Sequence, residues 1–429
     1  MRARIIAGMG ANSFGMAISI AIQLVSLPLF LHFWNLETYG KWIILSAIPS
    51  YLSMADVGMV TAAGNRMAMA MGRNDQFEAN QIFQSAQAFM ACICSVIALL
   101  VLPIILFAPL PWFEGLDQRV ALSAMSVGVL VAFFGGLSEA AFKASERYAF
   151  GTMLSNYVRL GEWFGCILGL ALIGNFAAVA LSGLVIKLLG SIVGMILVNK
   201  TSHGLRWGLR NAKRTEIKSM IKPAISFMAF PLANALSFQG VTILVGAMFG
   251  PVSVVLFNSY RTIARVAVQV TAIFSHVLWP EFSRLFGQAA NQAIKALYLR
   301  TSLLGAFQAV FLSLLLYFTS PLLLKTWTHD AIHFDSSLML LMMVYAAIGG
   351  VWHIPRVLLM ATNQHVNLAF WTLLSALFSV GLSWLFGHVF ELSGVAGAMV
   401  LSELFIAIIC GYLANNVVFS NQGRKFALI

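Results

Sequence analysis

Long apolar runs separated by short polar stretches dominate the pattern of the chain. A membrane-spanning helix needs about 20 mostly apolar residues. Runs of that kind occur near 8–33, 40–64, 80–108, 119–142, 148–174, 176–198, 219–248, 252–282, 294–319, 335–360, 366–387 and 393–419. None has the alternation of a membrane β-strand, so helices are the predicted element. The pattern predicts an all-α polytopic membrane protein with about twelve transmembrane helices.

The composition of the chain excludes several classes of soluble protein. Hydrophobic residues make up 60% of the 429 residues and charged residues only 10%, whereas soluble domains carry about 25% charged residues. A cytosolic enzyme, a disordered protein and a nucleic-acid binder are therefore excluded. The net charge of +11 fits the excess of basic residues in cytoplasmic loops. The four cysteines lie in apolar runs, which predicts small hydrophobic packing residues without a disulfide.

Lysine and arginine are distributed unevenly among the predicted loops. With the N-terminus in the cytoplasm, 20 of the 26 fall on the cytoplasmic side. Three lie outside, at Lys41, Arg119 and Lys325. The other three fall within spans, at Lys187, Arg261 and Arg265. This asymmetry predicts that both termini are cytoplasmic.

The longest basic segment divides the chain near its middle. We expect an N-terminal six-helix bundle at 1–198, a basic cytoplasmic linker at 199–222 and a C-terminal six-helix bundle at 223–429. Two such halves around a central cleft are a common plan among transporters.

Signs of catalysis or cofactor binding are missing from the sequence. It contains no G-x-S-x-G, H-E-x-x-H, P-loop or G-x-G-x-x-G motif, and the predicted outer loops are short. His329, Asp330, His333 and Asp335 have a spacing that a metal could use, but a solvated loop is the favoured interpretation. We therefore expect a protein that is not an enzyme and has no cofactor.

Polar residues inside spans are costly and indicate candidate functional positions. The eighth span carries Asn258, Arg261, Arg265, Gln269 and His276 within a stripe about 80° wide. Such a stripe faces either a water-filled cavity or partner groups within the protein. The alternative to a cavity is that both arginines bind helix carbonyls or acids and only hold the bundle together.

Other spans carry weaker polar signals. The first has Asn12, Ser19, Gln23 and Ser26 on one face, which suits a cleft lining or ordinary helix packing. In the second span, Asp56 is either a packing and helix-end acceptor or a functional group.

Two charges lie deep in the sixth and twelfth spans. Lys187 and Glu403 are candidates for a structural ion pair, and Glu403 is also a candidate for proton coupling. Two further acids near the cytoplasmic face are predicted to form local pairs within helices, Glu139 with Lys143 and Glu162 with Arg159.

Several short segments resemble a known family. FWNLETYGKW (Phe33–Trp42) and MADVGM (Met54–Met59) resemble the two ends of helix two in the Wzx-type O-antigen flippases. HVLWPEFSRLFG (His276–Gly287) and ATNQHVNLAF (Ala361–Phe370) resemble that family's helix-eight ending and its turn between helices ten and eleven. The family belongs to the multidrug/oligosaccharidyl-lipid/polysaccharide exporter superfamily. The resemblance implies two six-helix bundles in the bacterial inner membrane that flip undecaprenyl-pyrophosphate-linked oligosaccharides.

A pyrophosphate substrate agrees with arginines inside the membrane, because guanidinium groups bind phosphate bidentately. We expect Arg261, Arg265 and Lys187 to grip it, with four neutral side chains lining the site: Asn258, Gln269, Gln23 and Asn12. Glu403 is expected to provide proton access for coupling, and Asp56 is expected to have a conformational or packing role. The coupling ion is H⁺ or Na⁺.

The expected partners are membrane lipids and the lipid-linked oligosaccharide, with the polymerase and chain-length proteins of the same pathway beside a monomeric flippase. Two alternatives remain. One is a multidrug-and-toxin-type exporter, although 8–33 and 219–248 hold no Asp or Glu for cation coupling. The other is a membrane-embedded enzyme of glycan assembly.

Overall fold

The computed structural model describes residues 2–108, 115–202, 204–288, 290–362, 364 and 366–419. These residues form helices and connecting turns, with no strand among them. They divide into two compact units, Met1–Pro231 and Leu232–Ile429. The sequence pattern had indicated an all-α membrane protein, and this architecture confirms it.

Unit one begins with a long helix and a broken one, followed by four further long helices. Its elements are α1 (Arg2–Phe33), α2 (Leu36–Leu52), a 3₁₀ turn (Ser53–Asp56), α3 (Met59–Gly72), α4 (Gln76–Phe107), α5 (Leu116–Ala144), α6 (Tyr148–Leu172), α7 (Phe176–Thr201) and most of α8 (Arg214–Ala235). Asn35, Asp75 and Asn175 cap α2, α4 and α7, as short polar side chains do when they accept from unpaired amides.

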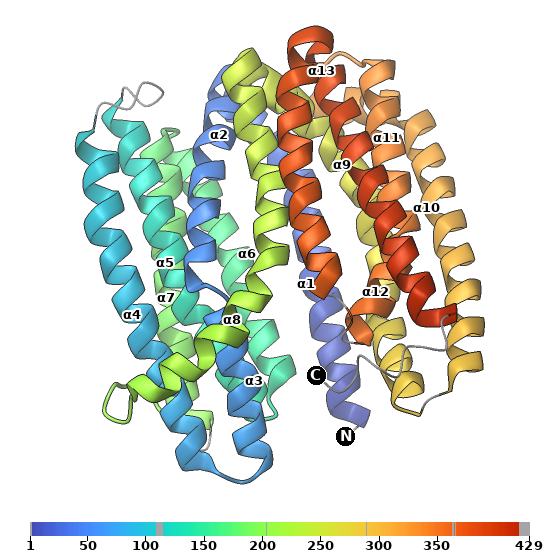
Figure 1. Cartoon of the computed structure of the whole chain (residues 1–429). Helices are drawn as coiled ribbons and strands as arrows, with labels where there is room; N and C mark the ends of the chain where they lie inside the picture. The colour runs from blue at the N-terminus through green and yellow to red at the C-terminus, as the bar shows by residue number, and fades with distance from the viewer. Residues whose placement is uncertain are drawn as a thin grey trace. The chain divides into compact units, whose positions relative to one another are not determined.

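Unit two contains the remaining helices (Figure 1). They are a π-helical turn (Leu236–Gly240), α9 (Val241–Gly287), α10 (Asn291–Thr328), α11 (Ser336–Val351), α12 (His353–Ala361) and α13 (Val366–Phe419). Two of these helices are each divided by non-helical backbone, α9 at Gly250 and α13 at Phe390 and Glu391. Figure 1 shows that α13 folds back on itself.

Nine stretches of the described residues are long and apolar enough to cross a membrane. Two of them, Phe230–Thr271 and Val366–Phe419, contain the breaks in α9 and α13. Once these are divided and α6 is added, the segments correspond to the twelve apolar runs of the sequence. The runs thus locate the helices well, because burial in lipid imposes a minimum apolar length.

The division between the two compact units falls within α8. Residues 204–213, part of the predicted linker, belong to unit one, and the boundary at Pro231 and Leu232 falls inside α8. Arg66 on α3 forms an ion pair of 2.7 Å with Glu216 on α8, which holds the start of α8 on unit one.

The second predicted span is not one continuous helix. Val57 and Gly58 adopt left-handed backbone angles between the 3₁₀ turn and α3, with φ of 51° and 75°. Asp56 Oδ1 accepts a hydrogen bond of 3.0 Å from the Gly58 amide. Asp56 therefore satisfies a backbone donor at a helix break, which agrees with the predicted helix-end role.

Glycines bring α6 and α7 close together in unit one. A Cβ at Gly169 would lie 2.5 Å from the Ala178 carbonyl oxygen, and one at Gly165 would lie 2.8 Å from the Ser182 oxygen. Small residues allow such close approach between membrane helices. Nearer the other end of the same helices, this packing borders a cavity with α5.

Candidate functional site

Arg261 is a buried cation in unit two. Its side chain on α9 is 6% exposed. The guanidinium donates 2.9 Å to the Phe238 carbonyl, 2.6 Å to Thr242 Oγ1, and a further bond to Asn258 Oδ1. The rings of Phe238 and Phe257 lie 5.4 and 5.6 Å from it. Arg261 thus binds a helix carbonyl and neighbouring polar groups, as in the structural alternative considered for this stripe.

Arg265 lies one helical turn farther along α9 in a different environment. Its guanidinium sits 5.0 Å from the ring centre of Phe238, which gives a cation–π contact. The described residues place no carboxylate within ion-pair distance of it. Arg261 and Arg265 also interact electrostatically with each other. The interior of unit two therefore holds two adjacent cations, one held by three hydrogen bonds to the protein and one with an aromatic partner.

The rest of the predicted stripe is only partly engaged with the arginines. Asn258 joins Arg261 through its oxygen, while its buried Nδ2 has no hydrogen-bond partner among the described residues. Gln269 is half-buried two turns beyond Arg261. The side chain of His276 lies outside the described residues.

Glu403, on the second part of α13, accepts a hydrogen bond of 2.8 Å from Trp352 Nε1. Trp352 stands at the break between α11 and α12, and the guanidinium of Arg356 on α12 lies 5.7 Å from its ring centre. Arg356, which was counted among the cations of the cytoplasmic side, is half-buried within the candidate span Ser336–Ala361. The fold thus gathers a carboxylate, an indole and a third arginine around one helix break.

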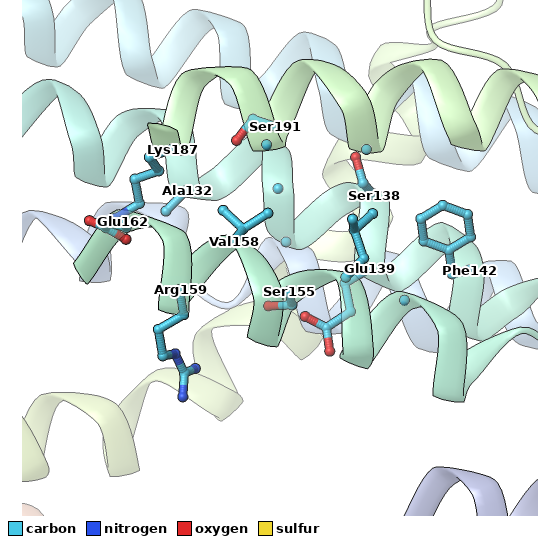
Figure 2. A pocket seen from close by; sticks show the side chains of 16 residues that line it. Ala132, Ser138, Glu139, Phe142, Ser155, Val158, Arg159, Glu162, Lys187 and Ser191 are labelled. Carbon is cyan, nitrogen blue, oxygen red and sulfur yellow. Dashed lines mark hydrogen bonds and ion pairs between the residues drawn. The ribbon is translucent and has the colours of Figure 1, made fainter. Parts of the chain in front are cut away.

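Unit one has its own cavity, of about 320 Å³, between α5, α6 and α7. Figure 2 shows Lys187 beside Glu162 at one end of it, with Glu139 farther along. Lys187 Nζ and Glu162 Oε1 form an ion pair of 2.8 Å. The acid partner considered for Lys187 was Glu403, and the structure shows a different one, because α6 and α7 pack directly on each other. The cation of Lys187 is therefore compensated.

The predicted local pairs within helices are replaced by contacts between helices. Arg159 Nη1 donates 2.8 Å to Ser19 Oγ on α1 instead of binding Glu162. Glu139 accepts a bond of 3.3 Å from Thr152 on α6. Helical spacing places the candidate partners near one another, but in the structure Arg159 and Glu139 bind side chains on adjacent helices.

The polar face of α1 packs against α6. Asn12 Oδ1 accepts from Tyr148 at 3.1 Å, and Ser26 Oγ accepts from Trp163 Nε1 at 2.9 Å. Gln23 is half-buried on the same helix. Asn12 thus takes part in the ordinary helix packing that was the alternative to a cleft lining.

The cluster from His329 to Asp335 caps helices. His329 ends α10 with a left-handed backbone, and Asp335 accepts from the amides of Ser337 and Leu338 at the start of α11. Among the described residues, no group of three His, Cys, Asp or Glu side chains could hold a metal.

Sequence reasoning missed the residues that surround the predicted charges. They are Phe238, Thr242, Trp352 and Glu162. Each comes from another helix than the charge it contacts or, for Thr242, from the other side of the break in α9 at Gly250, so periodicity within one span does not point to it. The one available signal was His353–Arg356, where a proline and an arginine interrupt an apolar run.

No protein-family model matches the chain, and no curated protein matches it in sequence. Solved structures share its fold. An inward-facing multidrug resistance MATE family transporter of the MOP superfamily is 13% identical, covering 93% of this chain and 98% of its own, with a TM-score of 0.70. An outward-facing one is 14% identical over 97% and 95%, with a TM-score of 0.68.

A third solved structure is described by the polarity of its binding pocket. It is a MOP superfamily transporter from Pyrococcus furiosus, with a binding pocket of reverse polarity that suggests a different function. It is 13% identical to this chain, covers 97% of this chain and 95% of its own, and has a TM-score of 0.71. At these identities the comparisons show the fold, which is that of MOP superfamily transporters.

Proposed function

We propose that the chain is a flippase that moves lipid-linked oligosaccharide pyrophosphates across the bacterial inner membrane by alternating access. The fold supports transport, because solved proteins that share it are described in both inward-facing and outward-facing conformations. The pair Arg261 and Arg265 carries the proposal for the substrate. Two adjacent cations inside a membrane-spanning unit require an anion, polar partners or water.

The balance of basic and acidic side chains favours unit two as the anion site. Among the described residues, its interior holds Arg261, Arg265 and Arg356 against one nearby carboxylate, Glu403. The cavity of unit one holds Arg159 and Lys187 against Glu139 and Glu162, which balances its charge. The proposed pyrophosphate site therefore lies in unit two. In this proposal Lys187 has a structural role within unit one.

The two arginines have different roles in this proposal. Arg261 is held by hydrogen bonds to Phe238, Thr242 and Asn258, so it fixes the electrostatic potential and the position of α9. Arg265 presents its guanidinium to the pyrophosphate, with which it forms bidentate hydrogen bonds. The aromatic contact with Phe238 orients it without neutralising its charge.

The competing function is drug export, because two solved proteins of this fold are described as multidrug resistance transporters. A cation is repelled by an interior with excess positive charge. The reverse polarity described for the Pyrococcus protein supports the view that the fold accommodates pockets of differing charge. In the proposed pathway the flippase acts as a monomer and delivers the flipped lipid-linked oligosaccharide to the polymerase and chain-length proteins.

The test is complementation of a bacterial strain that lacks its O-antigen flippase and carries a matching glycan pathway. Arg265→Ala should abolish surface glycan at normal protein level, and Arg265→Lys should restore only part, because an ammonium lacks the planar fork. Arg300→Ala, at an exposed position on α10, is the matched control and should retain activity. Full activity of Arg265→Ala, or drug resistance without glycan export, would contradict the proposal.

A further inference from the structure

The described part of the connection between α7 and α8 has a defined structure. Residues 204–213, here called the basic strap, follow the end of α7 at Thr201 and lead into α8 at Arg214. They are non-helical, yet the adjoining face of α4 holds them along most of their length. The strap therefore has a defined position on unit one instead of acting as a loose tether.

Polar side chains of α4 bind the strap through its backbone. Gln84 makes two of these bonds, donating 3.1 Å to the Arg206 carbonyl and accepting 2.7 Å from the Asn211 amide. Three more α4 residues accept from strap amides at 2.9 Å: Asn80 from Arg206, Gln87 from Gly208, and Ser85 from Lys213. Since the backbone makes these bonds, the strap's side chains remain available for other contacts.

The strap has an inner apolar face and an outer basic one. Leu205 is fully buried, and Trp207 packs its ring 5.2 Å from Phe83. The outward side chains are basic and exposed: Arg206, Arg210, Lys213 and, at the start of α8, Arg214. Leu209 stands among them and is 58% exposed.

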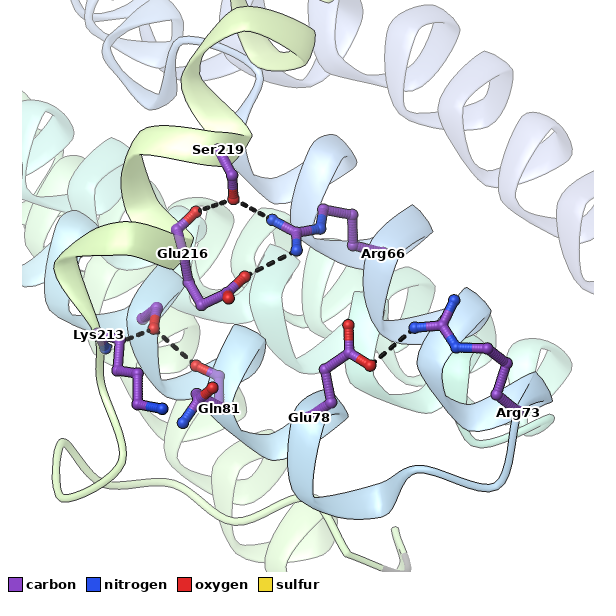
Figure 3. Close-up of polar contacts among 8 residues, drawn as sticks. Arg66, Arg73, Glu78, Gln81, Lys213, Glu216 and Ser219 are labelled. Atoms are coloured by element: carbon purple, nitrogen blue, oxygen red, sulfur yellow. Dashed lines mark hydrogen bonds and ion pairs between the residues drawn. The ribbon is translucent and has the colours of Figure 1, made fainter.

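The acidic residue of α8 nearest to the strap in sequence does not neutralise these cations. Glu216 is paired with Arg66 on α3, as Figure 3 shows beside the end of the strap at Lys213. The described part of the chain shows no ion pair for Arg206, Arg210, Lys213 or Arg214. Four cations on an ordered backbone therefore face outward without an internal counter-charge.

We propose that the basic strap binds the headgroups of anionic phospholipids. It directly follows α7, a candidate membrane span that ends at Thr201, so it lies where a bilayer presents its headgroups. Each basic residue near an anionic membrane surface adds to the attraction, and Leu209 can enter the boundary between headgroups and acyl chains. The fixed backbone lowers the entropy lost when the phosphates are bound.

Binding of short-chain phosphatidylglycerol to the purified full-length protein in detergent tests this surface. Native mass spectrometry should show more bound phosphatidylglycerol than phosphatidylcholine, and 0.5 M salt should weaken the preference, as about that concentration screens exposed charges. The variant R206Q/R210Q/K213Q/R214Q should bind phosphatidylglycerol at least about tenfold more weakly. Equal binding of the two lipids by the wild type would overturn the proposal.

Two control variants distinguish lipid binding by the strap from a general effect of positive charge and from an effect of misfolding. K143Q/R147Q/K295Q/R300Q removes the same charge at exposed positions elsewhere and should keep most of the binding. Gln84→Met leaves every cation but removes two backbone anchors, and binding should fall severalfold. Equal losses in both quadruple variants would overturn a specific surface, and unchanged binding by Gln84→Met would overturn the requirement for docking on α4.

Discussion

The indole of Trp352 donates a hydrogen bond of 2.8 Å to Glu403 Oε1 at the point where α11 gives way to α12. A Cβ added to Gly349, one turn earlier, would lie 3.0 Å from the same carboxylate oxygen. The acid is thus packed against a helix break, where gain or loss of a proton alters a hydrogen bond that orients two elements. This geometry supports Glu403 as the coupling group.

Glu403→Gln tests that coupling role directly. The amide cannot take up a proton, but its oxygen still accepts from Trp352, so the protein should fold while its flipping in proteoliposomes no longer responds to an imposed pH difference. Asp56→Asn is the matched comparison and should keep the response, because its oxygen still accepts from the Gly58 amide. A full pH-gradient response in Glu403→Gln would show that this carboxylate is structural.

Substitution of Arg261 and of Arg265 should lower the stability of the protein by different amounts. Arg261→Ala leaves Phe238 O, Thr242 and Asn258 without their buried partner and should lower the free energy of unfolding by about 2 kcal/mol or more. Arg265→Ala removes a cation–π contact and should cost about 1 kcal/mol. Thermal unfolding in detergent distinguishes the two, and equal losses would contradict the assigned roles.

The ion pair between Lys187 and Glu162 gives a third prediction. Glu162→Gln should destabilise unit one by about 1 to 2 kcal/mol, since both side chains keep some exposure to solvent. The double variant Lys187→Gln with Glu162→Gln should recover much of that loss and still flip substrate. If the double variant folds normally but does not flip substrate, the result would show that Lys187 takes part in substrate binding.

Val57 gives a fourth prediction, because a β-branched residue is held there in the left-handed region with φ of 51°. Val57→Gly should raise stability by about 1 kcal/mol through release of that strain. Thr61→Gly, at an exposed and regular position of α3, should lower stability by about 0.5 to 1 kcal/mol. A loss of stability in both variants would show that the Val57 side chain contributes more than its backbone costs.

Topology can be measured with reporter fusions. The charge distribution predicts cytoplasmic signals at Lys213 and Gln422 and external signals at Gly115 and Asp330. An external signal at Lys213 would overturn the assignment and would also place the basic strap on the wrong leaflet for most anionic lipid.

The sequence by itself determined the class of protein and the positions of its helices. Apolar runs of sufficient length have one stable outcome in a bilayer, so the turns near Gly250 and Glu391 and the ends of α4 to α7 follow from local composition. It also singled out the two α9 arginines, since charge within an apolar run is visible without any partner.

Only the tertiary structure decided which groups those charges contact. Lys187 meets Glu162 and Glu403 meets Trp352 through contacts between helices, which depend on how each helix is rotated and how closely it packs. The basic strap shows the same dependence: its composition suggested a linker, whereas bonds from α4 fix it on unit one. Spacing along a helix specifies which face a side chain occupies, and packing specifies what lies opposite that face.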